Sequence, residues 1–303
     1  MEKIAYLMLV HNDSEHLVRL INKLNYEADF YVHIDGKVSV EIFKSALSEM
    51  PNVYFISERF PVFWGGFNMI QATNALLESA CASSIKYKRL VLLSGADYPL
   101  VANSKIHSFF ENHRNEEFIR GFNVTESNIP QYLNQIQKFH MMDKIFITPF
   151  ITKVIKKITS SILYKSPYIK AKNGDFDVYF GSQWWAITPQ CAKEMLYIIK
   201  ENKEIDRYFK HSFAPDEKYF HTVFFNSTFR NKNVDGGPGI FEERGTWRWA
   251  NLHHIDPSLN KWYSVKDADE VFTSTKLFIR KVNTEFSHEL LKKIDDRTKE
   301  EIL

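Results

Sequence analysis

The sequence predicts an α/β fold built on a mixed, mainly parallel sheet with helices on both faces. Through the first hundred residues, short apolar runs alternate with segments in which apolar residues recur at helical spacing. Strands that alternate with helices form βαβ units, in which the strands lie parallel. A chain of 303 residues with 44% hydrophobic residues is long and apolar enough for one large core.

The predicted elements follow in order along the chain. The run KIAYLMLV (3–10) is typical of a buried strand, and the segment 14–24 has its leucines and isoleucine at helical spacing. Further strands are expected over 28–35, 52–57, 87–95, 178–188 and 276–282. Further helices are expected over 40–50, 66–83, 189–200 and 215–227, and an amphipathic helix is expected at the end of the chain.

Charge and composition exclude several classes of protein. Lysine and arginine number 39 against 37 aspartate and glutamate residues, and this net charge of +2 lacks the basic excess of a dedicated nucleic-acid-binding domain. Cys81 and Cys191 are far apart and have no neighbour at ligand spacing, so neither a disulfide framework nor a zinc site is expected. Aromatic residues make up 15% of the chain, more than a core needs, and rings are surfaces on which sugars and nucleobases stack.

The apolar run at the N-terminus is too short for a secretory signal, and no later segment is long enough to span a bilayer. We therefore expect a cytoplasmic protein. The stretch 138–172 is rich in lysine and apolar residues, with Asp143 as its single acidic residue. It is expected to be helical and either to contact an anionic membrane surface peripherally or to present an ordinary solvated helix face.

Polar clusters directly follow three of the predicted strands: His11-Asn12-Asp13, the segment 33–37 and Ser94-Gly95-Ala96-Asp97. In parallel sheets ligands bind at the carboxyl ends of the strands. The clusters are therefore a candidate ligand crevice, although strands can also end in ordinary polar turns.

Seven motifs in a fixed order then resemble a known family. They are VHND, YVHIDGK, the turn Trp64-Gly65-Gly66-Phe67, LLSGADYPL, GSQWWAIT, APDEKYFHT and LFIRKV. Together they resemble the core-2/I-branching glycosyltransferases (glycosyltransferase family 14), which include branching β-1,6-N-acetylglucosaminyltransferases and peptide O-xylosyltransferases. The resemblance spans roughly residues 3–285 and is weakest over 120–175.

The resemblance implies a GT-A-type fold, a UDP-sugar donor and an inverting transfer that leaves a β-linkage. We expect one domain over 1–303, with 1–103 as the nucleotide-binding half and 104–303 as the acceptor and catalytic half. Animal members carry an N-terminal membrane helix and many cysteines. This chain resembles instead a bacterial-type relative that builds surface polysaccharide, another glycoconjugate or a lipid-linked glycan. UDP-N-acetylglucosamine is favoured as donor, and UDP-xylose is possible.

An inverting transfer needs a base for the acceptor hydroxyl and positive charge for the departing diphosphate. Glu217 in PDEKYF matches the family's base, and Asp216 would orient it on the acceptor side. Lys281 matches the family's diphosphate-binding lysine. Its neighbour Arg280 is expected to face the other way, because consecutive residues of a strand point to opposite faces. Arg248 is the expected second cation, with Arg244 as the alternative.

No metal is expected at the site, because the family resembled is metal-independent. The triplets Asp175-Phe176-Asp177 and Asp267-Ala268-Asp269 do not follow the fourth strand, where the fold places a metal-binding Asp-x-Asp. Two alternatives stay open: a metal-dependent retaining transferase that uses Asp175 and Asp177, and a nucleotide-sugar or glycan-binding module without turnover.

The remaining candidates would bind the two substrates. In the family, segments matching Val10, His11 and Asp35 line the uridine pocket. Trp64, Gly65 and Gly66 would let the backbone approach the donor, and Asp97 would contact the donor sugar or orient its turn. On the acceptor side, Trp184 or Trp185 would stack on a sugar. Trp247 and Trp249, two positions apart, would share one face of a strand.

Overall fold

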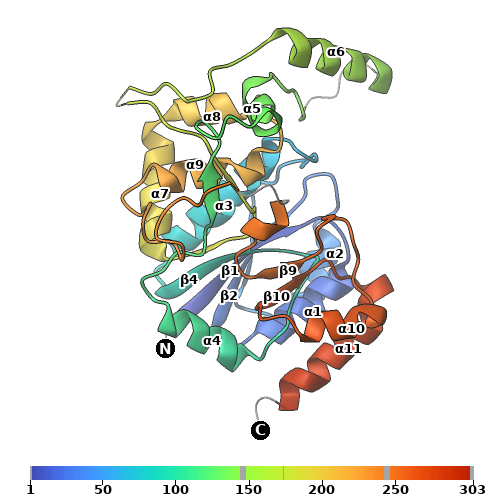
Figure 1. Cartoon of the computed structure of the whole chain (residues 1–303). Coiled ribbons are helices and arrows are strands. Elements are labelled where there is room, and N and C mark those ends of the chain that lie inside the picture. Colours follow the sequence, from blue (N-terminus) through green and yellow to red (C-terminus); the bar gives the residue numbers. More distant parts are fainter. Residues whose placement is uncertain (1, 144–147, 173, 242–245, 301–303) are drawn as a thin grey trace.

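The structure is a computed structural model that describes residues 2–143, 148–172, 174–241 and 246–300. Figure 1 shows a central sheet with helices packed on both faces. The strand order is β3-β2-β1-β4-β8, in which β8 is antiparallel to β4 and the other neighbours are parallel. The predicted mixed, mainly parallel sheet is therefore confirmed. These strands are β1 Lys3–Val10, β2 Ala28–Ile34, β3 Val53–Phe55, β4 Tyr87–Ser94 and β8 Ala186–Ile187.

Alternating residues of β1 belong to two different cores, one on each face of the sheet. Leu7 and Leu9 point into the core that contains α3 and α7, whereas Tyr6 and Met8 point into the core that contains α1 and α11. A strand buried on both faces has to be apolar throughout, which explains the uninterrupted run of β1. The helices on the first face include α3 Asn68–Ala82, α7 Pro189–Glu201, α8 Lys203–Phe209 and α9 Tyr219–Phe225, and those on the second α1 Ser14–Leu24, α2 Glu41–Ala46, α4 Asn103–Asn112, α10 Ala268–Phe272 and α11 Thr284–Glu300.

Asp13 fastens the last helix to the first. Its carboxylate accepts a hydrogen bond from the backbone N–H of His16 (3.0 Å), which caps α1. The same carboxylate accepts bonds from the backbone N–H and the hydroxyl of Thr284 (both 2.8 Å) at the start of α11. The segment that precedes α11 is thereby held beside the carboxyl end of β1.

Two small sheets extend the central one. In the first, β10 Phe278–Arg280 lies between β5 Asp97–Pro99 and β9 His253–Ile255. In the second, β6 Gly121–Asn123 pairs with β7 Tyr179–Gly181. The second half of the chain therefore adds β8 to the central sheet and β10 to a strand of the first half. The division of the chain into a nucleotide-binding and a catalytic half stays a prediction.

Three predicted elements differ in the structure. The strand expected over 178–188 is two strands, β7 and β8, because the chain leaves the small sheet at Gly181 and joins the central sheet only at Ala186. The helix expected over 215–227 is a 3-10 turn, η1 Pro215–Glu217, followed by α9. The segment 246–249 is a 3-10 turn and not a strand, so Trp247 and Trp249 do not share a strand face.

The weakly patterned region contains two helices, α5 Pro130–Gln137 and α6 Pro149–Ile162. In Figure 1, α6 projects from the body of the molecule above the other helices. Within the stretch 138–172, the predicted helical character is confirmed over α6, whereas the described residues 138–143 and 163–172 are not helical. Across the described ranges, no helix combines the length and apolar character needed to cross a bilayer.

Candidate active site

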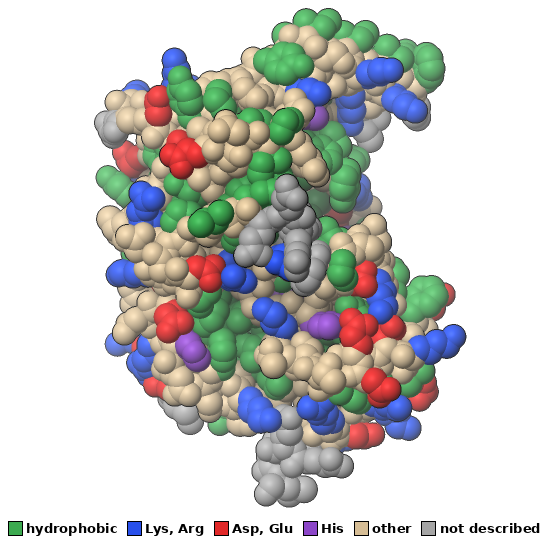
Figure 2. All heavy atoms as spheres, in the orientation of Figure 1, with side chains coloured by type: hydrophobic (Ala, Val, Ile, Leu, Met, Phe, Trp, Pro, Cys, Tyr) green, Lys and Arg blue, Asp and Glu red, His purple; other side chains and the backbone are tan. Residues whose placement is uncertain are grey.

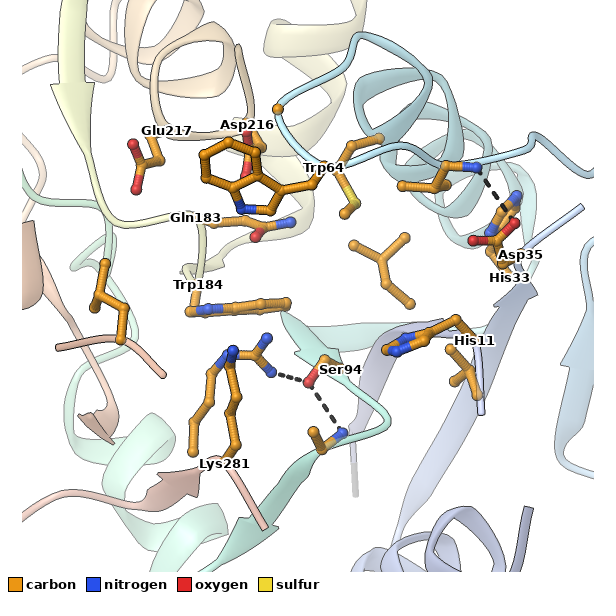
Figure 3. A pocket seen from close by; sticks show the side chains of 18 of the residues that line it. His11, His33, Asp35, Trp64, Ser94, Gln183, Trp184, Asp216, Glu217 and Lys281 are labelled. Atoms are coloured by element: carbon orange, nitrogen blue, oxygen red, sulfur yellow. Dashed lines mark hydrogen bonds between the residues drawn. The ribbon is translucent and has the colours of Figure 1, made fainter. Parts of the chain in front are cut away.

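A cavity of about 400 Å³ opens at the carboxyl ends of the central strands. Strand ends and one turn from the first hundred residues line it on one side, and loops from the second half of the chain line it on the other (Figure 3). The predicted site residues that meet in this cavity are Val10, His11, Asp35, Trp64, Gly65, Trp184, Asp216, Glu217 and Lys281.

Asp35 organises the end of β2. One of its carboxylate oxygens accepts hydrogen bonds from the backbone N–H groups of Lys37 (2.9 Å) and Val62 (3.3 Å), and the other pairs with the Lys37 ammonium (3.3 Å). Burial lowers the pKa of nearby His33 to about 4, and its Nε2 accepts a bond from the N–H of Phe60 (3.0 Å). The neutral His33 imidazole and the Asp35 carboxylate thus fix the loop that leads into the next turn.

The turn at Trp64 and Gly65 joins the two sides of the cavity. Gly65 has a φ of 71°, a left-handed conformation that favours glycine, and its carbonyl accepts a bond from the N–H of Ala214 (3.2 Å). The Trp64 ring is 78% exposed and meets the edge of the Phe213 ring at 5.2 Å between centroids. The turn therefore lies directly against the loop that carries Glu217.

The second glycine of this turn has a different role from the one expected. A Cβ at Gly66 would overlap the carboxylate of Asp143, which accepts bonds from the N–H groups of Phe67 (2.5 Å) and Asn68 (3.1 Å). Asp143 thus caps the N-terminus of α3 from another part of the chain. Sequence analysis missed this contact because 75 residues separate Asp143 from Asn68.

Glu217 ends the 3-10 turn that follows Ala214 and Pro215. Burial raises the pKa of its carboxyl to about 7, and the positive charge of Lys218 offsets this only in part. Burial likewise raises the pKa of Asp216, one of whose carboxylate oxygens is buried and has no hydrogen-bond partner. A carboxyl whose pKa lies near neutrality is about half ionised at pH 7, and its carboxylate form accepts a proton readily, which are the properties of a general base.

Lys218 stabilises the turn from its buried side. Its side chain is fully buried, and its ammonium donates to the carbonyls of Phe213 (3.2 Å) and Ala214 (3.0 Å). Desolvation lowers the pKa of Lys218. The two carbonyls that it holds belong to the loop that places Glu217 in the cavity.

Asp97 does not line the cavity, which favours the second of its two expected roles, orientation of its own turn. It is fully buried and accepts bonds from the backbone N–H of Ser94 (2.7 Å), from Arg280 (2.8 Å) and from His253 (3.3 Å). Burial alone would raise the pKa of Asp97, but the charge of Arg280 and the contact with His253 hold it well below its usual range. Asp97 therefore orients Arg280.

Arg280 and Lys281 both line the cavity, so the expectation that only one could do so was wrong. Strand β10 ends at Arg280, and the alternation of side chains does not continue to Lys281. The Arg280 guanidinium also lies over the Trp184 ring, 4.1 Å from its centroid. Burial and the neighbouring Arg280 lower the pKa of Lys281. Two adjacent cations therefore face the same space.

The two tryptophans of the GSQWW motif lie in different surroundings. Trp184 lines the cavity under Arg280, whereas Trp185 is 1% exposed and packs in the core against Phe220 at 5.4 Å between ring centroids. The predicted stacking platform is thus available on Trp184 only. Gln183, which sequence analysis did not single out, also lines the cavity, and its amide nitrogen is buried without a partner.

Comparison with known proteins identifies the family. The model of the Core-2/I-Branching enzyme family matches residues 4–269. The chain belongs to this family. It is 23% identical to a Mus musculus N-acetyllactosaminide β-1,6-N-acetylglucosaminyl-transferase and 24% identical to its Homo sapiens counterpart, over 87% of this chain and 59% of each relative. A Bos taurus β-1,3-galactosyl-O-glycosyl-glycoprotein β-1,6-N-acetylglucosaminyltransferase 3 is 29% identical over 48% of this chain and 33% of its own length.

The chain thus spans about three-fifths of the length of the first two relatives. Among solved structures, mouse xyloside xylosyltransferase 1 is similar with a TM-score of 0.36 and 10% identity, covering 91% of this chain and 96% of that one. The WbbM bifunctional glycosyltransferase has a TM-score of 0.33 and 11% identity, covering 91% and 45%. Membership of the core-2/I-branching family confirms the predicted resemblance and agrees with the predicted GT-A-type α/β class.

One of the predicted cations of this core-2/I-branching chain lies outside the cavity that holds Glu217. Arg248 lines a second cavity of about 650 Å³ together with Arg120 and Lys276, and it does not line the cavity that holds Lys281. Its 3-10 turn, rather than the expected strand, places it there. Trp249 from the same turn is buried in the core beside Phe122, at 5.5 Å between ring centroids. Arg244 and the side chain of Trp247 lie outside the described residues.

The two Asp-x-Asp triplets of this core-2/I-branching chain do not line the cavity. Asp177 accepts a bond from the Asn123 amide (3.2 Å), and Asp267 pairs with Lys261 (2.7 Å) and caps the turn that Ser264 begins. Within the four described ranges, no group of three or more histidine, cysteine, aspartate or glutamate residues is placed to hold a metal ion. Metal independence stays a prediction.

Proposed function

We propose that the protein is an inverting, metal-independent glycosyltransferase that moves N-acetylglucosamine from a UDP-sugar to a glycan hydroxyl and forms a β-linkage. The observation that carries this proposal is the pairing, in one cavity, of a carboxyl with a pKa of about 7 and two adjacent cations. Transfer of a sugar from a diphosphate needs these two groups: a base for the acceptor and positive charge for the leaving group.

The donor would lie along the strand ends. The uridine would contact Val10, His11 and Asp35, and the diphosphate would lie against Arg280 and Lys281. A guanidinium offers a planar pair of donors and an ammonium offers a compact charge, so the two together suit a diphosphate. In Figure 3, His11 and Asp35 lie across the cavity from Glu217, which leaves room for the sugar between them.

The chemical step would use Glu217 on the acceptor side. The acceptor oxygen attacks the anomeric carbon, its proton passes to the Glu217 carboxylate, and the bond from that carbon to the diphosphate oxygen breaks. Arg280 and Lys281 would stabilise the negative charge that develops on the UDP. Trp184 would present its ring to the apolar face of a sugar, and the unpartnered groups of Gln183 and Asp216 would bind its hydroxyls.

The identity of the transferred sugar rests on the relatives. Those named above are called β-1,6-N-acetylglucosaminyl transferases, and this favours UDP-N-acetylglucosamine over UDP-xylose. The acceptor would be a glycan or a lipid-linked glycan of surface polysaccharide or glycoconjugate synthesis, and we propose that the protein acts in the cytoplasm.

The test is a transfer assay with a panel of UDP-sugars, with and without EDTA. We expect turnover of UDP-N-acetylglucosamine that the chelator leaves unchanged. Loss of turnover with EDTA would favour a metal-dependent transferase. UDP binding without transfer or hydrolysis of any UDP-sugar, on a broad panel of glycan acceptors, would favour a binding module. Preference for UDP-xylose would correct the donor and leave the reaction class in place.

A further inference from the structure

Helix α6 turns its apolar side chains toward solvent. Phe150, Val154, Ile158 and Ile162 follow one another at four-residue spacing, and they are 76, 40, 52 and 69% exposed. We call these four residues the α6 ridge. An amphipathic helix of a globular protein normally packs such a stripe against the core. The side chains of the α6 ridge are instead exposed. Figure 1 shows that α6 projects from the body, and Figure 2 shows hydrophobic side chains along the outer edge of this projection.

The opposite side of α6 is polar, and this side faces the protein. Thr152 is buried, and the Lys156 ammonium donates to the carbonyl of Met142 (3.2 Å). Thr148 caps the helix by accepting a bond from the N–H of Ile151 (3.2 Å). These polar contacts orient the helix with its ridge outward, although burying the ridge against the body would remove apolar surface from water.

The charge around the α6 ridge has one sign. Residues 148–172 contain six lysines and no aspartate or glutamate. Lys153 and Lys157 are exposed, and at 100° per residue they flank the ridge on the side of Phe150. Tyr164, just beyond the helix, is 61% exposed. An apolar face flanked by lysines, with aromatic residues near both ends, matches the interface of an anionic bilayer.

We propose that α6 docks in the interface of an anionic phospholipid membrane, with the α6 ridge among the acyl chains and Lys153 and Lys157 against lipid phosphates. A second copy of the chain fits less well, because packing ridge against ridge would bring the lysines of both copies together with no acidic residue in 148–172 to neutralise them. Membrane binding by α6 requires no enzymatic turnover, so its test does not depend on the proposed transfer reaction.

The test is co-sedimentation of the full chain with phosphatidylcholine vesicles, with and without phosphatidylglycerol. We expect binding to the anionic vesicles only, weakening as salt is raised because screening acts on the lysines. Equal binding to both kinds of vesicle, or binding to neither, would overturn the proposal. A dimer in solution that Ile158→Ser dissociates, with no vesicle binding by the wild-type chain, would assign the α6 ridge to self-association instead.

Two pairs of substitutions separate the ridge from the charge. Phe150→Ser with Ile158→Ser, and Lys153→Gln with Lys157→Gln, should each lower partitioning into anionic vesicles by about tenfold. The matched controls lie on other helices: Ile42→Ser with Tyr197→Ser, which are 62 and 64% exposed, and Lys292→Gln with Lys293→Gln on α11. The controls should stay within about twofold of the wild-type chain.

Thermal unfolding and UDP binding show that each variant is folded. Equal losses in the controls and the α6 variants would mean that binding follows overall charge or apolar surface, and would overturn the assignment to α6. Transfer to a soluble acceptor should be unchanged in the α6 variants. Failure of the vesicle test with intact transfer would refute only the docking, and failure of transfer with intact vesicle binding would refute only the proposed function.

Discussion

The two walls of the cavity differ in how their polar groups are satisfied. On the strand-end wall, formed by the carboxyl ends of β1, β2 and β4, Asp35 accepts bonds from Lys37 and Val62. On the loop wall, formed by residues 182–184 and 216–217, a carboxylate oxygen of Asp216 and the amide nitrogen of Gln183 are buried without partners. Unsatisfied buried groups are costly, and they persist where a ligand completes them.

The difference assigns separate tasks to the walls. The strand-end wall is satisfied within the protein, because Asp35 accepts bonds from its loop and Asp97, buried below the wall, accepts a bond from Arg280. The loop wall keeps a carboxyl with a raised pKa and open hydrogen-bonding groups, which is a cost to stability that suits a reacting site. Substitutions on the loop wall should therefore affect the rate of reaction, and substitutions below the strand-end wall should affect folding.

The largest expected effect comes from the loop wall. Glu217→Gln keeps the shape of the side chain and removes the base, so the rate of transfer should fall by about two to four orders of magnitude. UDP affinity, measured by calorimetry, should stay within about twofold, because Glu217 lies away from the nucleotide in the proposed complex. Glu78→Gln, an exposed change on α3, is the matched control.

The same substitution should stabilise the fold at pH 8. Burial raises the pKa of Glu217, so the folded chain binds this proton more tightly than the unfolded chain, and the ionised carboxylate destabilises the fold as pH rises through about 7. A neutral glutamine lacks this cost, and the melting temperature at pH 8 should rise. Near-normal transfer by Glu217→Gln would remove this residue from the role of base.

Asp97, which is buried below the strand-end wall, tests the expectation that substitutions there affect folding and not the reaction rate. Asp97→Ala leaves Arg280 and His253 without their buried partner, so the free energy of unfolding should fall by about 3–5 kcal/mol in urea titrations. The pKa of Asp97 is depressed, so this stabilisation is present at neutral pH and is lost as pH falls below the ordinary range of a carboxyl. Glu41→Ala, which removes an exposed pair with Lys44, should change stability by less than about 1 kcal/mol.

A small effect of Asp97→Ala, matching that of Glu41→Ala, would mean that Asp97 is not the anchor of Arg280. A normal stability with a large loss of UDP affinity would return Asp97 to the role of a ligand contact. The two outcomes separate the interpretations that the sequence leaves open for this residue.

The strand-end wall was largely predictable from the sequence, and the loop wall was not. Buried parallel strands are apolar throughout, so the points where polar residues begin, at His11 and Asp35, are visible in the sequence. The loop wall depends on contacts between distant segments. Asp143 against Gly66 and Gly65 against Ala214 follow no local pattern, and they decide where the loop lies.

The alternation of side chains along a strand also failed as a prediction at the point where β10 ends. Arg280 and Lys281 face the same cavity because β10 stops between them. Trp184 and Trp185, by contrast, point to different places, as alternation predicts. The motif match located Glu217, but only the folded chain shows the burial that raises its pKa. Arg248 was misplaced because 3-10 and strand geometry direct its side chain to different places.

Lys281 should give an intermediate effect. Lys281→Met removes a charge from the proposed diphosphate site, and a hydrogen bond to a charged group contributes about 1.5–3 kcal/mol, so the Kd for UDP should rise by about tenfold to a hundredfold. Lys281→Arg should retain most of the affinity. Lys266→Met, an exposed change outside the cavity, should leave the Kd unchanged. An unchanged Kd in Lys281→Met would show that Arg280 binds the diphosphate without its neighbour.

The pH dependence of transfer should give the smallest effect and the sharpest contrast between the walls. A base acts only when deprotonated, so kcat/KM should rise about tenfold per pH unit below about 7 and level off above it. On the strand-end wall, burial lowers the pKa of His33 to about 4, so this imidazole is neutral in this range. Burial lowers the pKa of His11 as well.

Burial also lowers the pKa of Lys165 to about 7, but its ammonium donates to the Tyr208 carbonyl (2.8 Å) and does not line the cavity. The residual rate of Glu217→Gln separates the two groups. If Glu217 is the base, the rise with pH disappears in this variant. A rise that persists unchanged would assign the titration to another group, and the loop wall would then differ from the strand-end wall in structure but not in chemistry.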